Sequence, residues 1–252
     1  MNGALYAVVS GSLAALRRLE ITANNLANTN TAGFKAQHLL VRSRSPGDLY
    51  APPGSGAPLG VSGRTAIATA NRSVTDLSQG AVQESGNPLD VAITGPGFFV
   101  VTTPNGERYT RQGQFHLDAT GTLVNAAGYA VQGDGGKEIS LPPGQVEIDA
   151  AGRVSVDGAQ RAALRVVRFM DAEAIVPEGA ALFAAEPEAQ VIDVDPAETQ
   201  LLQGSIENAN VDVIKGLLEL IDVTRAYEAY MRAMQQVDGS VETAIQQVGA
   251  KG

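Results

Sequence analysis

The stretch from residue 211 to residue 248, VDVIKGLLELIDVTRAYEAYMRAMQQVDGSVETAIQQV, decides the architecture of this chain. Its apolar residues recur at alternating spacings of four and three, the pattern of a helix with one apolar stripe. Asn210 is placed to cap this helix, and Asp212 would put a negative charge in the first turn. The stripe, apolar at all positions but two, consists of Val213, Leu217, Leu220, Thr224, Tyr227, Met231, Met234, Asp238, Val241, Ile245 and Val248.

A second helical pattern runs from about Asn2 to Asn28. It ends in a segment rich in asparagine with Gly33, residues that stop helices by tolerating left-handed backbone and by competing for main-chain hydrogen bonds. We therefore expect the helix to end near Asn28. Its apolar residues, at spacings of three, four or seven, are Leu5, Val9, Leu16, Leu19, Ala23 and Leu26.

The lengths of the two helices predict association. At 1.5 Å per residue the C-terminal helix would be about 55 Å long, whereas a body built from the intervening residues would be about 40 Å across. Part of the apolar stripe then has nothing in its own chain to cover it. We expect the helices to pair as a coiled-coil-like stem and other copies of the chain to cover the rest, with Gly216 and Gly239 allowing close approach. An ordinary helical hairpin lying on the domain is the alternative.

Between the helices the sequence changes character. Residues 45–63 are rich in proline, glycine and serine and are typical of a loop or linker. From Asp90 onward, short alternating segments separated by turns predict antiparallel strands. The expected fold class is α+β: an N-terminal stem helix in residues 1–34, an extended linker in 35–85, an all-β domain in 86–204 and a C-terminal stem helix in 205–252. The expected strands are 90–93, 98–103, 108–111, 114–117, 122–124, 146–148, 153–156, 163–170 and 181–184.

Composition excludes several classes of function. The 252 residues are 44% hydrophobic, which is enough for one large domain or two modest ones. A formal net charge of −9 opposes binding to nucleic acid or to an anionic membrane. The absence of cysteine excludes disulfides and thiolate sites. No window reaches the roughly 20 apolar residues of a membrane span, and Ser10, Gly11 and Ser12 break the N-terminal apolar run, so we expect no cleaved signal peptide.

The sequence contains no motif typical of catalysis or metal binding. Its two histidines, His38 and His116, lie in unrelated contexts, and it has no phosphate-binding glycine loop, H-E-x-x-H or G-x-S-x-G. Asp193 and Asp195 lack the full ligand spacing of a calcium loop. We therefore expect no enzyme activity, no small-molecule substrate, no metal and no cofactor.

Four stretches resemble, in order, the flagellar axial proteins of the rod and hook group. They are ANNLANTNTAGFK (23–35), LDVAITGPGFFVV (89–101), YTRQGQF (109–115) with DATGTLV (118–124), and QGSIENANV (203–211) leading to TRAYE (224–228). ALYAVVSG (4–11) and PLDVAI (88–93) are most similar to proximal-rod members, with a distal-rod or hook-type subunit as the alternative. The family-motif residues of the first stretch are Asn24, Asn25, Leu26, Ala27, Asn28, Gly33 and Phe34.

The resemblance implies a structural subunit of the bacterial flagellar basal-body rod, exported by the flagellar type III apparatus and assembled in the periplasm. Its terminal helices would form a tubular shaft that transmits torque and surrounds the export channel, with the β domain outside. The expected partners are copies of itself, neighbouring rod proteins and the export apparatus. The expected assembly residues are Leu5, Val9, Leu16, Leu19, Leu26, Val213, Leu217, Leu220, Tyr227, Met231 and Met234.

Two other functions are compatible with the residues. A secreted β-domain protein could bind or cleave a cell-wall polysaccharide, with Phe98, Phe99 and Tyr109 as a sugar platform, although adjacent aromatic residues in strands usually lie half in the core. An amphipathic coat on membranes is disfavoured by the net charge and by the lack of a basic flank on the stripe.

Overall fold

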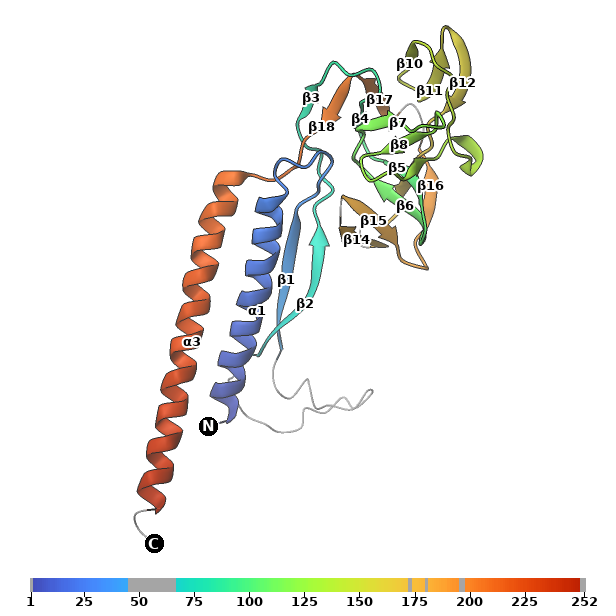
Figure 1. Ribbon diagram of the computed structural model, residues 1–252. Helices are drawn as coiled ribbons and strands as arrows, with labels where there is room; N and C mark the ends of the chain where they lie inside the picture. The colour runs from blue at the N-terminus through green and yellow to red at the C-terminus, as the bar shows by residue number, and fades with distance from the viewer. Residues whose placement is uncertain (1, 45–66, 172–173, 180, 195–197, 250–252) are drawn as a thin grey trace. The chain divides into compact units, whose positions relative to one another are not determined.

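A computed structural model describes residues 2–44, 67–171, 174–179, 181–194 and 198–249 of the chain. The chain divides into two compact units (Figure 1). The helical unit comprises residues 1–26, 37–74 and 213–252, and the β unit comprises residues 27–36 and 75–212. The loop expected at residues 45–63 lies outside the described residues.

The helical unit contains both terminal helices. Helix α1 (Asn2–Ala27) and helix α3 (Val213–Gly249) lie side by side in Figure 1, which confirms the predicted pairing of the two ends of the chain. At 1.5 Å per residue they are about 40 and about 55 Å long. The unit also contains a two-stranded sheet of β1 (Gln37–Arg44) and β2 (Ile67–Thr75), inside the segment expected to be a linker. Pairing satisfies main-chain groups that an isolated extended segment leaves to water.

The predicted cap of the C-terminal helix is wrong. Asn210 does not cap α3, which begins three residues later at Val213 and has no acidic residue in its first turn. The side-chain amide of Asn210 instead accepts a hydrogen bond from the Ala36 N–H at 2.7 Å and donates to the carbonyls of Asp76 and Ser78 at 2.8 and 3.1 Å. An asparagine satisfies main-chain groups of any segment within reach, and here those segments belong to the β unit.

The β unit is built from short antiparallel strands around one large sheet, as predicted. The order in that sheet is β14-β15-β6-β5-β9-β8-β7, with β13 pairing with both β5 and β16. These strands are β5 (Phe98–Thr103), β6 (Gly106–Thr110), β7 (Phe115–Leu117), β8 (Leu123–Asn125), β9 (Ala130–Val131), β13 (Val166–Phe169), β14 (Ile175–Gly179), β15 (Leu182–Ala185) and β16 (Val191–Asp193).

Three small sheets complete the unit. Strand β4 (Val91–Thr94) pairs with β17 (Gln200–Gln203), and β3 (Val82–Glu84) pairs with β18 (Ser205–Glu207). Strands β10 (Val146–Ile148), β11 (Arg153–Val156) and β12 (Ala159–Ala163) form a three-stranded sheet. A short 3-10 turn, η1, covers Asp134–Gly136.

The single strand expected at residues 163–170 is two strands in two sheets. Strand β12 ends at Ala163 in the three-stranded sheet, whereas β13 begins at Val166 and pairs with β5 in the large sheet. The residues between them change sheets: the Leu164 N–H donates to the Gly152 carbonyl at 2.8 Å, and the Arg165 N–H donates to the Gln132 carbonyl at 3.0 Å. The sequence does not reveal this change, because the apolar residues on both sides of Arg165 can be interpreted as one strand.

The core of the β unit contains the aromatic residues that could have formed a sugar platform. Phe98, Phe99 and Tyr109 are 3%, 0% and 6% exposed. The Phe99 ring packs edge-to-face on Phe115 at 5.0 Å, and Tyr109 packs in the same way on Phe169 at 4.8 Å. These rings therefore stabilise the core and present no face to a polysaccharide.

Candidate assembly interface and the buried charge cluster

Helices α1 and α3 contact each other in antiparallel orientation. Gly11 faces Tyr230: a Cβ added at Gly11 would lie 2.5 Å from the tyrosine Cε1. Near the other end of the contact, Gly216 lies opposite Leu26, with an added Cβ at 3.9 Å from the leucine Cδ1. The predicted close approach at Gly216 is thus an ordinary van der Waals contact within the chain, and the contact at Gly11 is tighter.

The assembly residues expected on α1 are mostly half-buried within the helical unit. Val9, Leu19 and Leu26 are half-buried, and Leu16 is 39% exposed. The side chain of Leu5 lies outside the described residues. Two residues that the sequence pattern did not select, Tyr6 and Leu13, are 59% and 60% exposed. They are seven residues apart and therefore share one face of the helix.

On α3 the expected stripe divides into two groups. Leu220, Tyr227 and Met234 are half-buried, whereas Val213, Leu217 and Met231 are exposed. Among the described side chains of α3, Val223 is the most buried, at 4% exposed, and the sequence pattern did not select it.

The three most exposed large apolar side chains in the described part of α3 were also missed. Ile214, Leu218 and Ile221 are 72%, 60% and 50% exposed, and with Val213 and Leu217 they cover one side of its first turns. We call these five residues the α3 patch. The predicted stripe took one apolar residue per helical turn, whereas the exposed surface is two residues wide. The adjacent apolar pairs at 213–214 and 217–218 are visible in the sequence and could have indicated this.

One family-motif residue, Asn25, fixes the chain where it leaves α1. Its side-chain carbonyl accepts the Gln37 N–H at 2.9 Å, and its amide donates to the Gln37 carbonyl at 2.8 Å. This pair of bonds reproduces the pairing of a neighbouring strand at the start of β1. Of the remaining motif residues, Asn24 and Ala27 are exposed, Leu26 and Asn28 are half-buried, and Gly33 and Phe34 are buried.

The β unit contains a buried cluster of three charges. The Lys35 ammonium lies 2.6 Å from Oε1 of Glu207, and the Arg111 guanidinium lies 3.3 Å from Oε2 of the same carboxylate. The side chains of Lys35 and Glu207 are fully buried and that of Arg111 is 4% exposed. Glu207 also accepts the Gly80 N–H at 2.8 Å, and Lys35 donates to the Ser78 carbonyl at 2.6 Å. The Glu207 carboxylate therefore links its own segment to the three segments that contain Lys35, Gly80 and Arg111.

Electrostatics make this cluster sensitive to loss of its carboxylate. Burial lowers the pKa of Lys35, and the hydrogen bond and charge of Glu207 act against that shift. Burial also lowers the pKa of Arg111, again opposed by Glu207. Asp76 contributes further negative charge near Lys35. The guanidinium carbon of Arg111 lies 5.3 Å from the centre of the Phe98 ring, and its Nε is buried without a hydrogen-bond partner among the described residues.

Main-chain bonds join the two end segments at the same place. The Gly33 N–H donates to the Glu207 carbonyl at 2.7 Å, and the Asn210 N–H donates to the Phe34 carbonyl at 3.4 Å. Gly33 has φ +68°, and a Cβ there would lie 2.4 Å from the carbonyl carbon of Arg111. Only glycine fits this backbone and this distance. The segment that follows α1 and the segment that precedes α3 are thus hydrogen-bonded to each other through their main chains.

The sequence analysis missed this cluster, although a signal was present. Lys35, Arg111 and Glu207 each lie in a different one of the stretches that carry the family resemblance. Charged residues are almost never fully buried unless they are paired. The segments 23–35, 109–115 and 203–211 each contain a single charged residue, which suggests that these segments meet in the fold. The sequence does not show which of the charges pair.

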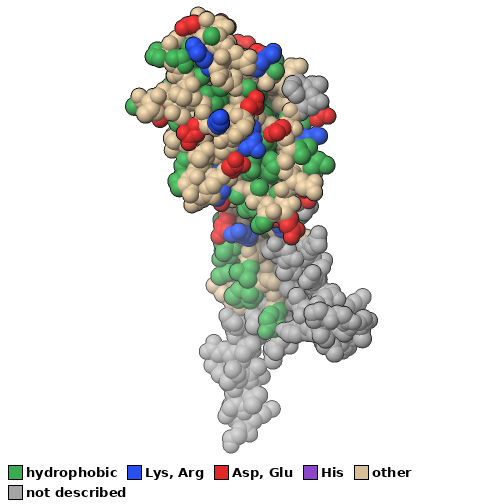
Figure 2. Space-filling model, turned by 90° about the vertical axis from the view of Figure 1, so that its right-hand side faces the viewer, with side chains coloured by type: hydrophobic (Ala, Val, Ile, Leu, Met, Phe, Trp, Pro, Cys, Tyr) green, Lys and Arg blue, Asp and Glu red, His purple; other side chains and the backbone are tan. Residues whose placement is uncertain are grey.

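The described surface shows neither a metal site nor a membrane span. No cluster of His, Cys, Asp and Glu among the described residues could hold a metal ion. None of the described helices is both long and apolar enough to cross a bilayer. On the face of the β unit seen in Figure 2, acidic and basic side chains are intermingled rather than segregated.

Comparison with known proteins agrees with this arrangement. Family models match residues 5–35 (flagella basal body rod protein), 92–156 (flagellar hook protein FlgE/F/G D1 domain) and 202–247 (flagellar basal body rod FlgEFG protein, C-terminal). The outer two cover most of both stem helices and the segments that meet at Glu207.

Relatives of known function match over the whole chain. The flagellar basal-body rod protein FlgF of Caulobacter vibrioides is 33% identical, with 99% of each chain covered. FlgF of Rhizobium meliloti is 32% identical with the same coverage, and FlgG of Bacillus subtilis is 30% identical over 97% of this chain and 98% of the relative. The chain belongs to the FlgE/F/G family of structural, non-enzymatic flagellar proteins, as a basal-body rod subunit of the FlgF type.

Proposed function

We propose that this rod subunit assembles with copies of itself and with neighbouring rod proteins through α1 and α3. The stem helices would form a tubular shaft in the proximal part of the periplasmic rod, which transmits torque and surrounds the export channel. Export through the flagellar type III apparatus belongs to the same proposal. The observation that carries it is the α3 patch, a continuous apolar surface that the helical unit leaves exposed.

A second copy of the chain offers a matching surface. Leu13 lies about half a turn of helix from Gly11, the residue that faces Tyr230 of α3 in the same chain, so the face with Tyr6 and Leu13 points away from α3. The α3 patch and this α1 face cannot meet within one hairpin. Between copies they form a contact of two different surfaces, which propagates into an open helical assembly rather than closing as a dimer.

The helix contacts also give the stagger between such copies. With Gly11 opposite Tyr230 and Leu26 opposite Gly216, the centre of the α3 patch lies roughly 16 residues further along α1 than the centre of the exposed face of Tyr6 and Leu13. At 1.5 Å per residue, parallel copies joined through these surfaces would be offset along the shaft by about 24 Å.

A charge placed in the α3 patch tests the assembly function. Leu218→Asp leaves the monomer fold intact, because Leu218 is 60% exposed, but puts an unpaired charge into the proposed interface. Leu220→Asp is a less specific change, because Leu220 is half-buried in the helical unit. We expect Leu218→Asp protein to keep the monomer's circular-dichroism spectrum and to fail to restore rods and swimming in cells that lack this subunit.

The matched control is Val176→Asp, which places the same charge on an exposed apolar residue of the β unit. Normal rods with Leu218→Asp would refute the proposal. The circular-dichroism spectrum of the parent protein should show more helix in the assembled form than in the monomer, since ends completed by neighbours are better ordered.

Cross-linking tests the pairing of the two surfaces. The chain has no cysteine, so introduced thiols are unique. Assembly of a mixture of Leu13→Cys and Leu218→Cys proteins, followed by oxidation, should give a disulfide between copies. Ala226→Cys, at an exposed position on another side of α3, is the control that should not cross-link to Leu13→Cys. Equal cross-linking by both would contradict the assigned faces.

A further inference from the structure

Strand β10 (Val146–Ile148) has one side without a partner strand. It is the edge of the three-stranded sheet, and its other side pairs with β11. The main-chain groups that face β11 belong to alternate residues: the Gln145 carbonyl accepts from the Asp157 N–H, and the Asp149 N–H donates to the Arg153 carbonyl. The Val146 carbonyl and the Ile148 N–H therefore point to the free side.

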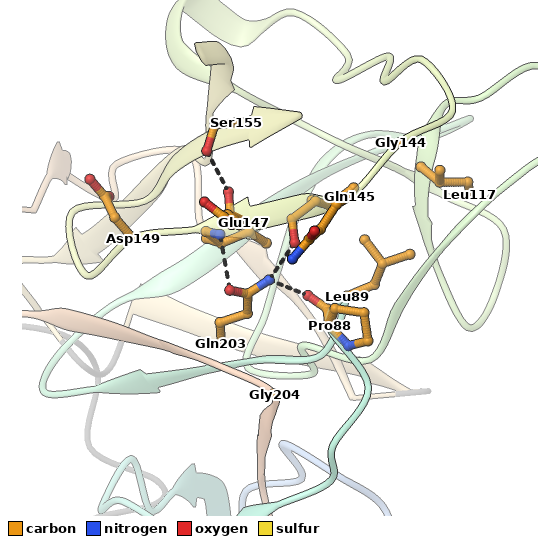
Figure 3. A pocket seen from close by; sticks show the side chains of 12 residues that line it. Pro88, Leu89, Leu117, Gly144, Gln145, Glu147, Asp149, Ser155, Gln203 and Gly204 are labelled. Carbon is orange, nitrogen blue, oxygen red and sulfur yellow. Dashed lines mark hydrogen bonds between the residues drawn. The ribbon is translucent and has the colours of Figure 1, made fainter. Parts of the chain in front are cut away.

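The side chain of Gln203 fills that position (Figure 3). Its carbonyl oxygen accepts a hydrogen bond from the Ile148 N–H at 3.2 Å, and its amide donates to the Val146 carbonyl at 2.9 Å. A third bond, from the amide to the Pro88 carbonyl at 2.8 Å, fixes the orientation of the group. A carboxamide has the donor and acceptor of a peptide group, so Gln203 supplies the two bonds that a residue of a neighbouring strand would make.

The main chain of β17 does not supply these bonds itself. The Leu201 N–H reaches the Ala150 carbonyl at 3.0 Å, but beyond Gln203 the chain turns at Gly204, which has φ +70° and donates to the Asp90 carbonyl. A groove of about 850 Å³ lies beside β10, lined by Leu89, Leu117 and Glu147 among others. The Gln203 side chain is thus what spans from β17 to the edge of β10.

We propose that Gln203 is an edge cap, which stands in for a strand and prevents β10 from pairing with an exposed strand of a second copy. An unpaired strand edge is a template for association with another chain. A subunit that reaches high local concentration during assembly is especially exposed to such pairing. This inference concerns the β unit and does not depend on the surfaces proposed for the helices.

Gln203→Leu tests the cap in the full-length protein. It removes both polar atoms of the side chain, which frees the Val146 carbonyl and the Ile148 N–H. We expect hydrogen exchange of the Ile148 amide to become at least tenfold faster and sedimentation velocity to show concentration-dependent oligomers that the parent does not form. Gln200→Leu is the matched control, since Gln200 is an exposed residue of the same strand.

Gln203→Glu covers the case in which Gln203→Leu does not fold. It keeps an acceptor for Ile148 but turns the donor into a second acceptor facing two carbonyls, so the same faster exchange and association are expected at neutral pH. Unchanged exchange at Ile148 would overturn the proposal, because the cap would not be protecting that edge. Faster exchange without more association than Gln200→Leu would overturn it equally, because the free edge would not recruit a second copy.

Discussion

Replacing Glu207 by glutamine tests whether the buried charge cluster holds the two end segments in the β unit. Glutamine keeps the size of the side chain and a carbonyl that can still accept from Gly80, so the change is chiefly the loss of one negative charge. Removing one partner of a buried ion pair costs about 3–5 kcal/mol, because the remaining charge stays buried without compensation. Glu207 compensates two cations, Lys35 and Arg111, and we expect a loss of about 4 kcal/mol, within that range.

The same reasoning predicts a smaller loss of stability when the cation Lys35 is replaced. Lys35→Met leaves Glu207 and Arg111 as one anion and one cation, so we expect a loss of only about 2 kcal/mol. Glu207→Gln at about 4 kcal/mol corresponds to nearly a thousandfold shift in the folding equilibrium, a large part of the 5–15 kcal/mol that holds a typical domain together.

Urea unfolding of the full chain measures the global effect, and hydrogen exchange at the Gly33 and Gly80 amides, which bond to Glu207, measures the local one. Glu84→Gln, an exposed carboxylate of the neighbouring strand β3, is the control and should lie within about 0.5 kcal/mol of the parent. A Glu207→Gln protein as stable as this control, or more stable than Lys35→Met, would refute the reasoning that the single carboxylate balances two buried cations.

Three further changes test other contacts. Gly11→Ala brings a methyl group to 2.5 Å from the Tyr230 ring and should loosen the helix pair by about 1–3 kcal/mol in thermal unfolding, with Tyr230→Leu restoring part of the loss. Gly33→Ala combines a left-handed backbone with a 2.4 Å clash and should destabilise the β unit by more than the roughly 1–2 kcal/mol of the backbone term alone. The Thr120 hydroxyl and nearby N–H groups lower the pKa of Asp118, so Asp118→Asn should be less stable than the parent at neutral pH, and the difference should vanish as the pH falls through that lowered pKa.

The architecture could be predicted from the sequence because it depends on local periodicity. The two stem helices follow from apolar spacing that persists for many turns, and the turns of the β unit contain the glycines and asparagines that turns require. The exposed side of α3 could not be predicted in the same way. Which of Leu217, Leu220 and Val223 faces α1 depends on the rotation of one helix against the other, and one residue of shift changes the face by about 100°.

The buried charge cluster and the Gln203 edge cap could not be predicted, because they depend on contacts between residues that are distant in sequence. Lys35 and Glu207 are 172 residues apart, and Gln203 reaches Val146 across 57 residues. Asn210 illustrates the same limit, since an asparagine before a helix is a good cap by local rules. Here its amide is held by Ala36 and Asp76, and local rules carry no information about such competitors.

The position of the charge cluster along the chain bears on how the proposed shaft could carry torque. Residues 27–36 follow α1 directly and residues 205–212 precede α3 directly, so a force on either helix reaches these segments first. The Gly33 bond to the Glu207 carbonyl joins the segments to each other, and the Glu207 side chain anchors both to Lys35 and Arg111. The two segments that continue from the helices are therefore joined to each other within the β unit. A buried ion pair is a poor source of net stability but is costly to break, which suits a joint that must keep its geometry under load.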